Sequence, residues 1–420
     1  MTTVSAGGVS RWSPTSAVLG AVAIVLPGLG VVAPLGLAPL LAVAAVVLLA
    51  INWRRAAAVL RDFTGFAALL AALSAWATLS AAWSILPVHS FLEGLRLLAI
   101  SAAGLICLSI ASALAPWERR QLGSALVLGL ALAIGFLIIV RFFALDLFQP
   151  ILSRAPPDAP LIRFDRGATV LVLALWPALI ASGSRKWLAA VLAVAAAVSV
   201  LALVSTAAKL ALVGGGVLLG AAYRWPKLVA AALAVGLMAF SVALPIAMPP
   251  PSEVVAIHQN APWLKPSAIH RLLIWRFAAN RFAERPLLGW GMDASRELPG
   301  AHESLADTVP GADMPRVAEQ LSLHPHNAVL QWEIELGLPG VLLCLGIVVL
   351  SLAKVARRQS SLPFQRATEL AWAGSALAIA LLSYGVWQAW WQSVLWLTAT
   401  LCAAVSGGTD GASREKTAPT

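Results

Sequence analysis

The chain has 420 residues, of which 60% are hydrophobic and 11% are charged. A soluble domain carries roughly 25% charged residues, so the composition excludes an ordinary soluble protein. A net charge of +10 is typical of a nucleic-acid binder only in a soluble chain, because membrane proteins collect basic residues in cytoplasmic loops. We therefore expect a membrane lipid environment and no nucleic-acid partner.

Long apolar runs recur along nearly the whole chain, and a spanning helix needs about 20 mostly apolar residues. We predict an all-α integral membrane protein with about twelve transmembrane helices, forming a single polytopic domain over residues 1–420. In chain order the predicted spans are 15–33, 35–52, 64–83, 92–114, 122–143, 167–183, 187–205, 207–222, 227–248, 328–352, 368–386 and 388–406.

The basic residues between these spans predict the orientation. If the N-terminus is cytoplasmic, every even-numbered link carries at least a basic pair, such as Arg54 and Arg55 or Arg357 and Arg358. The links on the opposite side are either nearly uncharged or long and of mixed charge. By the positive-inside rule both termini are cytoplasmic, 249–327 is a large periplasmic loop, and 407–420 is a cytoplasmic tail.

Two groups of cations lie at the outer ends of predicted spans, where polar groups are costly and often functional. Arg163 and Arg166 flank Asp165 at the start of the sixth span. Lys209 lies where the seventh span turns into the eighth. Each could bind an anionic group, or could anchor its helix by reaching to the membrane surface.

A third basic segment closes the large outer loop. Residues 267–283 form an amphipathic pattern that carries Arg271, Trp275 and Arg276. A helix of this kind suits the membrane interface. Its guanidinium groups also match phosphate oxygens in bidentate geometry. Both interpretations stay open from the residues alone.

The fourth segment is the most specific, because His326 opens the tenth span at the outer surface. A histidine there can accept or deliver a proton near neutral pH. Glu333 and Glu335 follow on the same predicted helix, and either could position the histidine. Gly337 and Gly340 stand on either side of a proline and predict a break in the helix within the membrane. A histidine that merely caps the span is the alternative.

This segment resembles the bacterial O-antigen ligases and the related O-antigen polymerases. Their signature is His, then Asn, Ser or Gln, nine residues, Gly, two residues, and Gly, Thr or Tyr. His326, Asn327, Gly337 and Gly340 stand at the matching places. The upstream Arg-x-x-x-Trp pattern, the Pro-Leu-Leu-Gly-x-Gly pattern at 286–291 and the order of spans and loops are also similar to the family.

The resemblance implies a membrane glycosyltransferase with a GT-C-like fold in the bacterial inner membrane. The implied donor is a glycan on undecaprenyl diphosphate, and a ligase would use the lipid A-core of lipopolysaccharide as its acceptor. The reaction would be inverting and would need neither metal nor other cofactor. The chain has no cluster with metal-ligand spacing, and we expect no metal site.

Residue by residue, the resemblance assigns the essential histidine to His326 and an essential outer-loop arginine to Arg271, with Arg276 as its rival. Arg166 matches an arginine of the earlier outer loop, with Arg163 beside it as a further diphosphate-binding candidate. Lys209 occupies a place where the family often has arginine. This departure keeps the charge but loses the guanidinium fork.

Several alternatives fit the same charges. A polymerase that joins repeat units on the same lipid carrier, or a protein O-oligosaccharyltransferase, would differ from a ligase only in the acceptor. A flippase of lipid-linked sugars is less favoured, because the polar groups gather on one side of the membrane instead of lining a path through it. A purely structural subunit would not need the clustered outer cations.

Overall fold

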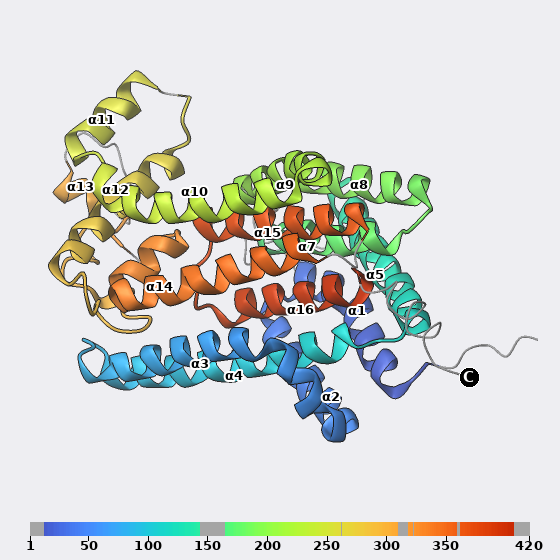
Figure 1. The fold of residues 1–420 in the computed structure, drawn as a ribbon. Coiled ribbons are helices and arrows are strands. Elements are labelled where there is room, and N and C mark those ends of the chain that lie inside the picture. Colours follow the sequence, from blue (N-terminus) through green and yellow to red (C-terminus); the bar gives the residue numbers. More distant parts are fainter. Residues whose placement is uncertain are drawn as a thin grey trace, which may run out of the picture.

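A computed structural model describes residues 12–142, 164–261, 263–309, 318–321, 323–358 and 362–406, without the side chains of 55–60, of 141–142 and of residue 308. The regular secondary structure of these residues is helical, apart from one isolated bridge between Ser304 and Glu319 (Figure 1). The long helices are α1 (Pro14–Val32), α2 (Leu37–Leu60), α3 (Thr64–Leu79), α4 (Pro87–Ser112), α5 (Pro116–Phe142), α7 (Asp165–Ala181), α8 (Lys186–Leu201), α9 (Thr206–Arg224), α10 (Pro226–Ala247), α14 (Ala328–Arg357), α15 (Pro363–Leu382) and α16 (Ala389–Ser406).

A helix stands at each of the predicted spans, which confirms the all-helical prediction for the described residues. Eight of them (α1–α5, α9, α10 and α14) are long and apolar enough to cross a membrane. The chain is therefore a multi-pass membrane protein. Many large apolar side chains, such as Val46 and Val217 (each 68% exposed), face outward from the bundle, as contact with lipid requires.

Helix α7 occupies the centre of the bundle, and every residue from 167 to 180 in it is buried. It packs against α1, α5, α8, α9, α15 and α16. Burial of a helix on all sides explains why its sequence is apolar all round instead of amphipathic. Its first turn, which carries Arg166, is thereby held in one position.

The predicted outer loop contains a small helical lobe, which projects at the upper left of Figure 1. The lobe comprises α11 (Pro251–Asn260), α12 (Pro266–Glu284), the short helix η5 (Ser295–Glu297) and α13 (Leu305–Thr308). Val254, Ile269, Leu273 and Leu305 form a separate apolar core within it. The amphipathic helix predicted at 267–283 is thus confirmed, and much of the loop is regular instead of irregular.

The boundary between the last two spans differs from the prediction. The sequence analysis extends one span to 386 and starts the next at 388, whereas α15 ends at Leu382 and α16 begins at Ala389. The residues between them form a link, 383–388, whose apolar members Val386 and Trp387 made the span look continuous. This link reaches the head of α14 and contributes to the site described next.

Candidate functional site

The head of α14 is built around a left-handed residue. Asn327 caps the helix, since its Oδ1 accepts hydrogen bonds from the backbone N–H groups of Val329 (3.0 Å) and Leu330 (3.2 Å). His326 just before it has φ of 54°. A non-glycine residue in this region costs of order 1 kcal/mol or more, so the surrounding structure must hold His326 in place.

Helix α14 breaks at Gly337, where φ is 61° and ψ is −167°, as the sequence predicted. The carbonyl of Glu335 lacks its helical partner because residue 339 is proline and has no N–H. The carbonyl of Ile334 lacks its partner because the N–H of Leu338 turns away at the break. Backbone N–H groups of Trp290 (2.8 Å) and Gly291 (2.9 Å) donate to these carbonyls, and Leu338 N–H donates to the carbonyl of residue 286.

This pairing explains why the 286–291 pattern and the α14 signature occur together. A Cβ on Gly337 would lie 2.3 Å from the carbonyl oxygen of Leu287, and a Cβ on Gly289 would lie 2.5 Å from that of Glu335. A Cβ on Gly340 would lie 2.2 Å from the Cβ of Leu336. The glycines therefore permit the contact of two backbones.

Glu335 is fully buried and joins three parts of the site. Its carboxylate accepts hydrogen bonds from Asp293 N–H (2.8 Å), Gln331 Nε2 (3.0 Å) and Trp387 Nε1 (2.5 Å), and it also contacts Ser295 Oγ. Glu333 is buried as well and has no hydrogen bond or ion pair with the described residues. Among these residues, neither carboxylate hydrogen-bonds His326.

Nδ1 of His326 lies 2.5 Å from the carbonyl oxygen of Ser383, in the 383–388 link. A carbonyl can only accept, so Nδ1 carries the proton and Nε2 of the neutral ring keeps a free lone pair. Burial lowers the pKa of His326, and the nearby charges of Arg271 and His270 lower it further, although the bond to Ser383 opposes them. The ring is therefore neutral near pH 7 and can accept a hydrogen bond or a proton at Nε2.

Helix α12 brings Arg271 to this histidine. Trp275, one turn further along, donates from Nε1 to the carbonyl of Pro325 (2.9 Å), and so fixes α12 against the head of α14. Arg271 has no hydrogen bond or ion pair with the described residues, and burial lowers its pKa. Arg276 points elsewhere, because its Nη1 donates to the carbonyl of Met248 (2.8 Å) at the end of α10.

Arg166 and Lys209 form a second group of cations at the same end of the bundle. The Arg166 guanidinium lies over the ring of Trp390, 5.2 Å from its centroid. Lys209 acts electrostatically on Asp165, as does Lys265 of the lobe. Tyr384 connects this group to His326, since it follows Ser383 and its hydroxyl lies within hydrogen-bonding distance of Thr169 (3.1 Å). Arg163 lies outside the described residues.

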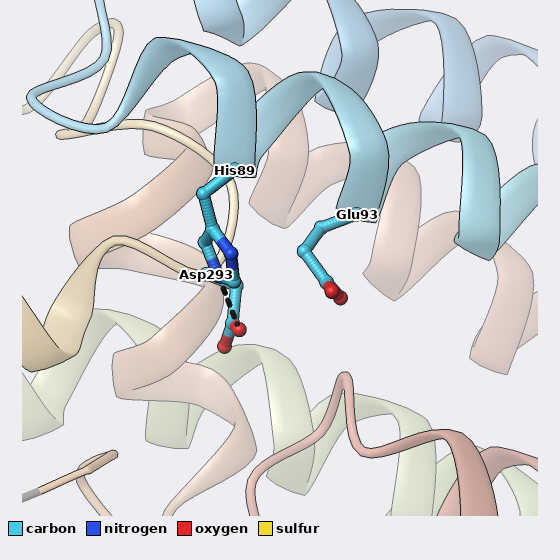
Figure 2. A group of neighbouring side chains, drawn as sticks. All are labelled: His89, Glu93 and Asp293. Atoms are coloured by element: carbon cyan, nitrogen blue, oxygen red, sulfur yellow. Dashed lines mark hydrogen bonds and ion pairs between the residues drawn. The ribbon is translucent and has the colours of Figure 1, made fainter.

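His89, Glu93 and Asp293 form the one group in the described part of the chain whose ligand atoms could meet at a metal ion, all within 4.8 Å of one another (Figure 2). His89 Nε2 already contacts Asp293 Oδ2 at 2.9 Å. Arg296 pairs with Asp293 at 3.2 Å, and Arg96 pairs with Glu93. Two guanidinium groups thus balance the two carboxylates, and the group is an ion-pair network that ties α4 to the loop before η5.

A cavity of about 400 Å³ adjoins the site between α3, α4, α10, α14, α15 and α16. Its wall is mostly apolar and includes Ala328 and Trp332 near the start of α14. It also includes Lys354 and Arg358 at the far end of that helix. The cavity therefore follows α14 through most of the bundle.

The structure brings together most of the residues that the sequence singled out. His326, Arg271, Arg166 and Lys209 meet at one end of the bundle, while Arg276 caps α10. The 383–388 link, Lys265 and His324 also contribute to this site and were not predicted from the sequence. The polar residues and glycine of that link, set between two apolar runs, were the available signal.

Comparison with known proteins agrees with this arrangement. Residues 166–345 match the family model described as O-antigen ligase. The chain is 28% identical over 337 residues to a candidate polysaccharide ligase of Rickettsia felis, covering 77% of each chain. A similar protein of Rickettsia conorii is 29% identical and covers 67% of each chain. One from Rickettsia typhi is 35% identical over 134 residues, about a third of each chain.

The fold and site define a polytopic membrane protein with a polar site at one end of its helical bundle. The match runs from Arg166 through the break in α14, so it includes most of the residues gathered at this site. The family match and the relatives called polysaccharide ligases support the O-antigen ligase family for this chain.

Proposed function

We propose that this chain is an O-antigen ligase of the bacterial inner membrane, with a GT-C-like fold. It transfers a glycan from undecaprenyl diphosphate to a hydroxyl of the lipid A-core at the periplasmic face. The observation that carries the proposal is the pairing of a neutral His326, with its Nε2 free, and an unpaired Arg271 beside it.

The histidine supplies an acceptor for the attacking hydroxyl. With Nδ1–H donated to Ser383, Nε2 can receive the hydroxyl proton as the new glycosidic bond forms. Attack from the side opposite the diphosphate inverts the anomeric carbon. Asn327 and the Glu335 network support the histidine by fixing the head of α14.

The cations stabilise the leaving group. As the sugar–phosphate bond breaks, negative charge grows on the diphosphate, and fixed positive charge lowers the energy of that state. Arg271 and Arg166 offer guanidinium forks, and Lys209 offers a point charge. In the proposed step these side chains act without a metal ion.

The cavity along α14 suits the prenyl chain of the donor. Its apolar wall begins next to His326, at Ala328 and Trp332, so a diphosphate at the site would place its lipid at the mouth of the cavity. The prenyl chain would enter from lipid and not from water, so van der Waals packing against the cavity wall would hold it.

The proposed topology has twelve spans and both termini in the cytoplasm. In this orientation Lys354 and Arg358 at the far end of α14 face the cytoplasm, and the lobe at 249–327 faces the periplasm. A reporter fused after residue 406 that is active only in the periplasm is expected to stay inactive. An active reporter would reverse the orientation.

Transfer by the purified full-length protein tests the activity. Undecaprenyl-diphosphate-linked glycan and lipopolysaccharide core are supplied as donor and acceptor, and the product is separated on a gel. We expect core-linked glycan with wild type and none with His326→Ala. If donor is consumed but joins only other donor molecules, the protein is a polymerase instead.

A further inference from the structure

His324, two residues before His326, is buried to 7% exposure and is not among the charged groups described above. Its Nδ1 lies 3.2 Å from the backbone nitrogen of His326. Its Nε2 lies 3.1 Å from the backbone nitrogen of Gly385 in the 383–388 link and 3.3 Å from the side-chain amide nitrogen of Gln388. The ring thus joins the head of α14 to the link.

These contacts fix the protonation state of the ring. Each backbone N–H is a donor, and a neutral imidazole has one nitrogen that can accept, whereas an imidazolium has none. A neutral His324 can therefore accept from only one of these two backbone N–H groups at a time, and a protonated His324 can accept from neither. Burial lowers the pKa of His324 to about 3, and the nearby His326, Arg296 and Arg271 lower it as well. His324 stays neutral and is not a proton carrier.

The same ring forms a wall against His326. The two imidazoles meet edge to face, with centroids 4.3 Å apart. The space for His324 is closely matched, because a Cβ on Gly385 would lie 2.7 Å from its Cδ2. The left-handed backbone of His326 (φ of 54°) thus lies against Nδ1 of His324, and its ring lies between His324 and the Ser383 carbonyl.

We propose that His324 is a positioning residue for His326. It packs against the strained backbone and the ring of His326, keeps water from that ring, and fills the space between it and the 383–388 link that supplies the Ser383 carbonyl. The inference rests on the proposed transfer activity, since His324 acts only through His326. Other polar groups around His326 are Arg271 and His270 of α12, while Arg296 of η5 faces His324.

The test measures kcat, donor KM and the pH profile of transfer for wild type, His324→Ala and His324→Asn. We expect His324→Ala to lower kcat about tenfold or more, as a displaced catalytic group does, with donor KM within about twofold. The acid limb of the pH profile of His324→Ala should move to higher pH, because water that reaches His326 lets the pKa of the His326 ring rise toward its ordinary value. His324→Asn places an oxygen near the position of Nδ1 and should restore much of kcat.

His302→Ala is the matched control, because this lobe histidine is exposed and contacts only Glu297 and Glu319 among the described residues. It should behave as wild type. Unchanged kcat and an unchanged acid limb of the pH profile in His324→Ala would overturn the inference. A loss of kcat that accompanies a lower melting temperature, with the acid limb of the pH profile unmoved, would also overturn it. If wild type itself makes no product, the proposed function fails first.

Discussion

At the scale of the residue, two histidines placed two positions apart have opposite surroundings. His326 donates from Nδ1 to a carbonyl and keeps its Nε2 lone pair, whereas His324 has N–H groups directed at both of its ring nitrogens. The first ring can accept a proton from a substrate, and the second cannot be protonated without losing its contacts. The signature in the sequence identifies His326, but the role of His324 depends on the link 383–388, some 60 residues further along the chain.

We expect catalysis to depend on the forked geometry of the Arg271 guanidinium as well as on its positive charge. Replacement by alanine should lower kcat about 100-fold or more, as loss of one preorganised donor to a developing oxyanion does. Replacement by lysine should give an intermediate loss, because lysine keeps the charge without the bidentate geometry. Steady-state transfer rates measure both effects.

Arg281→Ala is the control for this series, since Arg281 lies on the same helix and pairs with Glu284 three residues on. It should retain nearly full activity. Equal transfer rates for Arg271→Lys and wild type would show that bidentate phosphate binding by Arg271 does not contribute to the reaction.

The buried neutral state of His324 predicts a loss of stability in acid. The pKa of His324 is lowered to about 3 in the folded protein, so the unfolded chain binds a proton first as the pH falls below about 6.5. The contribution of His324 to the free energy of unfolding is complete above about pH 6.5 and declines toward pH 3. At pH 5 the loss should be about 2 kcal/mol relative to pH 7.5.

Thermal unfolding of the detergent-solubilised protein at several pH values measures this loss. The comparison is with His324→Asn, which cannot titrate there and should lose less stability between pH 7.5 and pH 5. A melting temperature that falls equally with pH in both proteins would show that His324 does not hold a neutral ring.

At the scale of the element, α14 is a helix that the sequence correctly predicts to be broken. The pattern of Gly337, Pro339 and Gly340 indicates a break, because proline cannot donate and glycine permits positive φ. The donors to the carbonyls freed by this break were not predictable. They are the backbone N–H groups of residues 290 and 291, about 45 positions earlier in the chain. Local patterns predict where a helix ends, but not which distant backbone completes it.

Gly337→Ala should therefore destabilise the protein strongly. The Cβ would lie 2.3 Å from the Leu287 carbonyl oxygen, and the backbone has a conformation essentially restricted to glycine. A loss of about 3 kcal/mol or more is expected from such strain and overlap. Thermal unfolding and the yield of folded protein measure it.

Gly346→Ala serves as the control on the same helix, because its Cβ would meet only ordinary contacts, at 3.7 Å or more from Leu69. It should be neutral or slightly stabilising, since alanine favours a helix interior. A Gly337→Ala protein as stable as Gly346→Ala would contradict the described break.

At the scale of the whole molecule, the charges and apolar runs predicted the helical bundle and the gathering of polar groups at one end. Helix positions followed from hydrophobic length, which a single sequence displays directly. The cavity could not be predicted, because its wall combines side chains from six helices and depends on how those helices pack. The helical lobe was only partly predicted, since α11 and α13 are short and weakly patterned.

Filling the cavity should weaken binding of a lipid-linked donor. Ala399 lines it, and Ala399→Phe is expected to raise the donor KM several-fold while kcat changes little, because the prenyl chain lies away from the reacting atoms. Val217→Phe on the outward face of α9, where the side chain is 68% exposed, is the control and should leave KM unchanged. An unchanged KM in Ala399→Phe would exclude the cavity as the prenyl site.

Surface glycolipid of the native host tests the central claim most directly. The gene is deleted, wild type or His326→Ala is restored, and the lipopolysaccharide is run on a gel. The account predicts that deletion leaves only core while long glycan accumulates on the prenyl carrier, and that wild type but not His326→Ala restores the full-length glycolipid. Core bearing a single repeat unit would show a polymerase, and unchanged glycolipid after deletion would contradict the proposed acceptor.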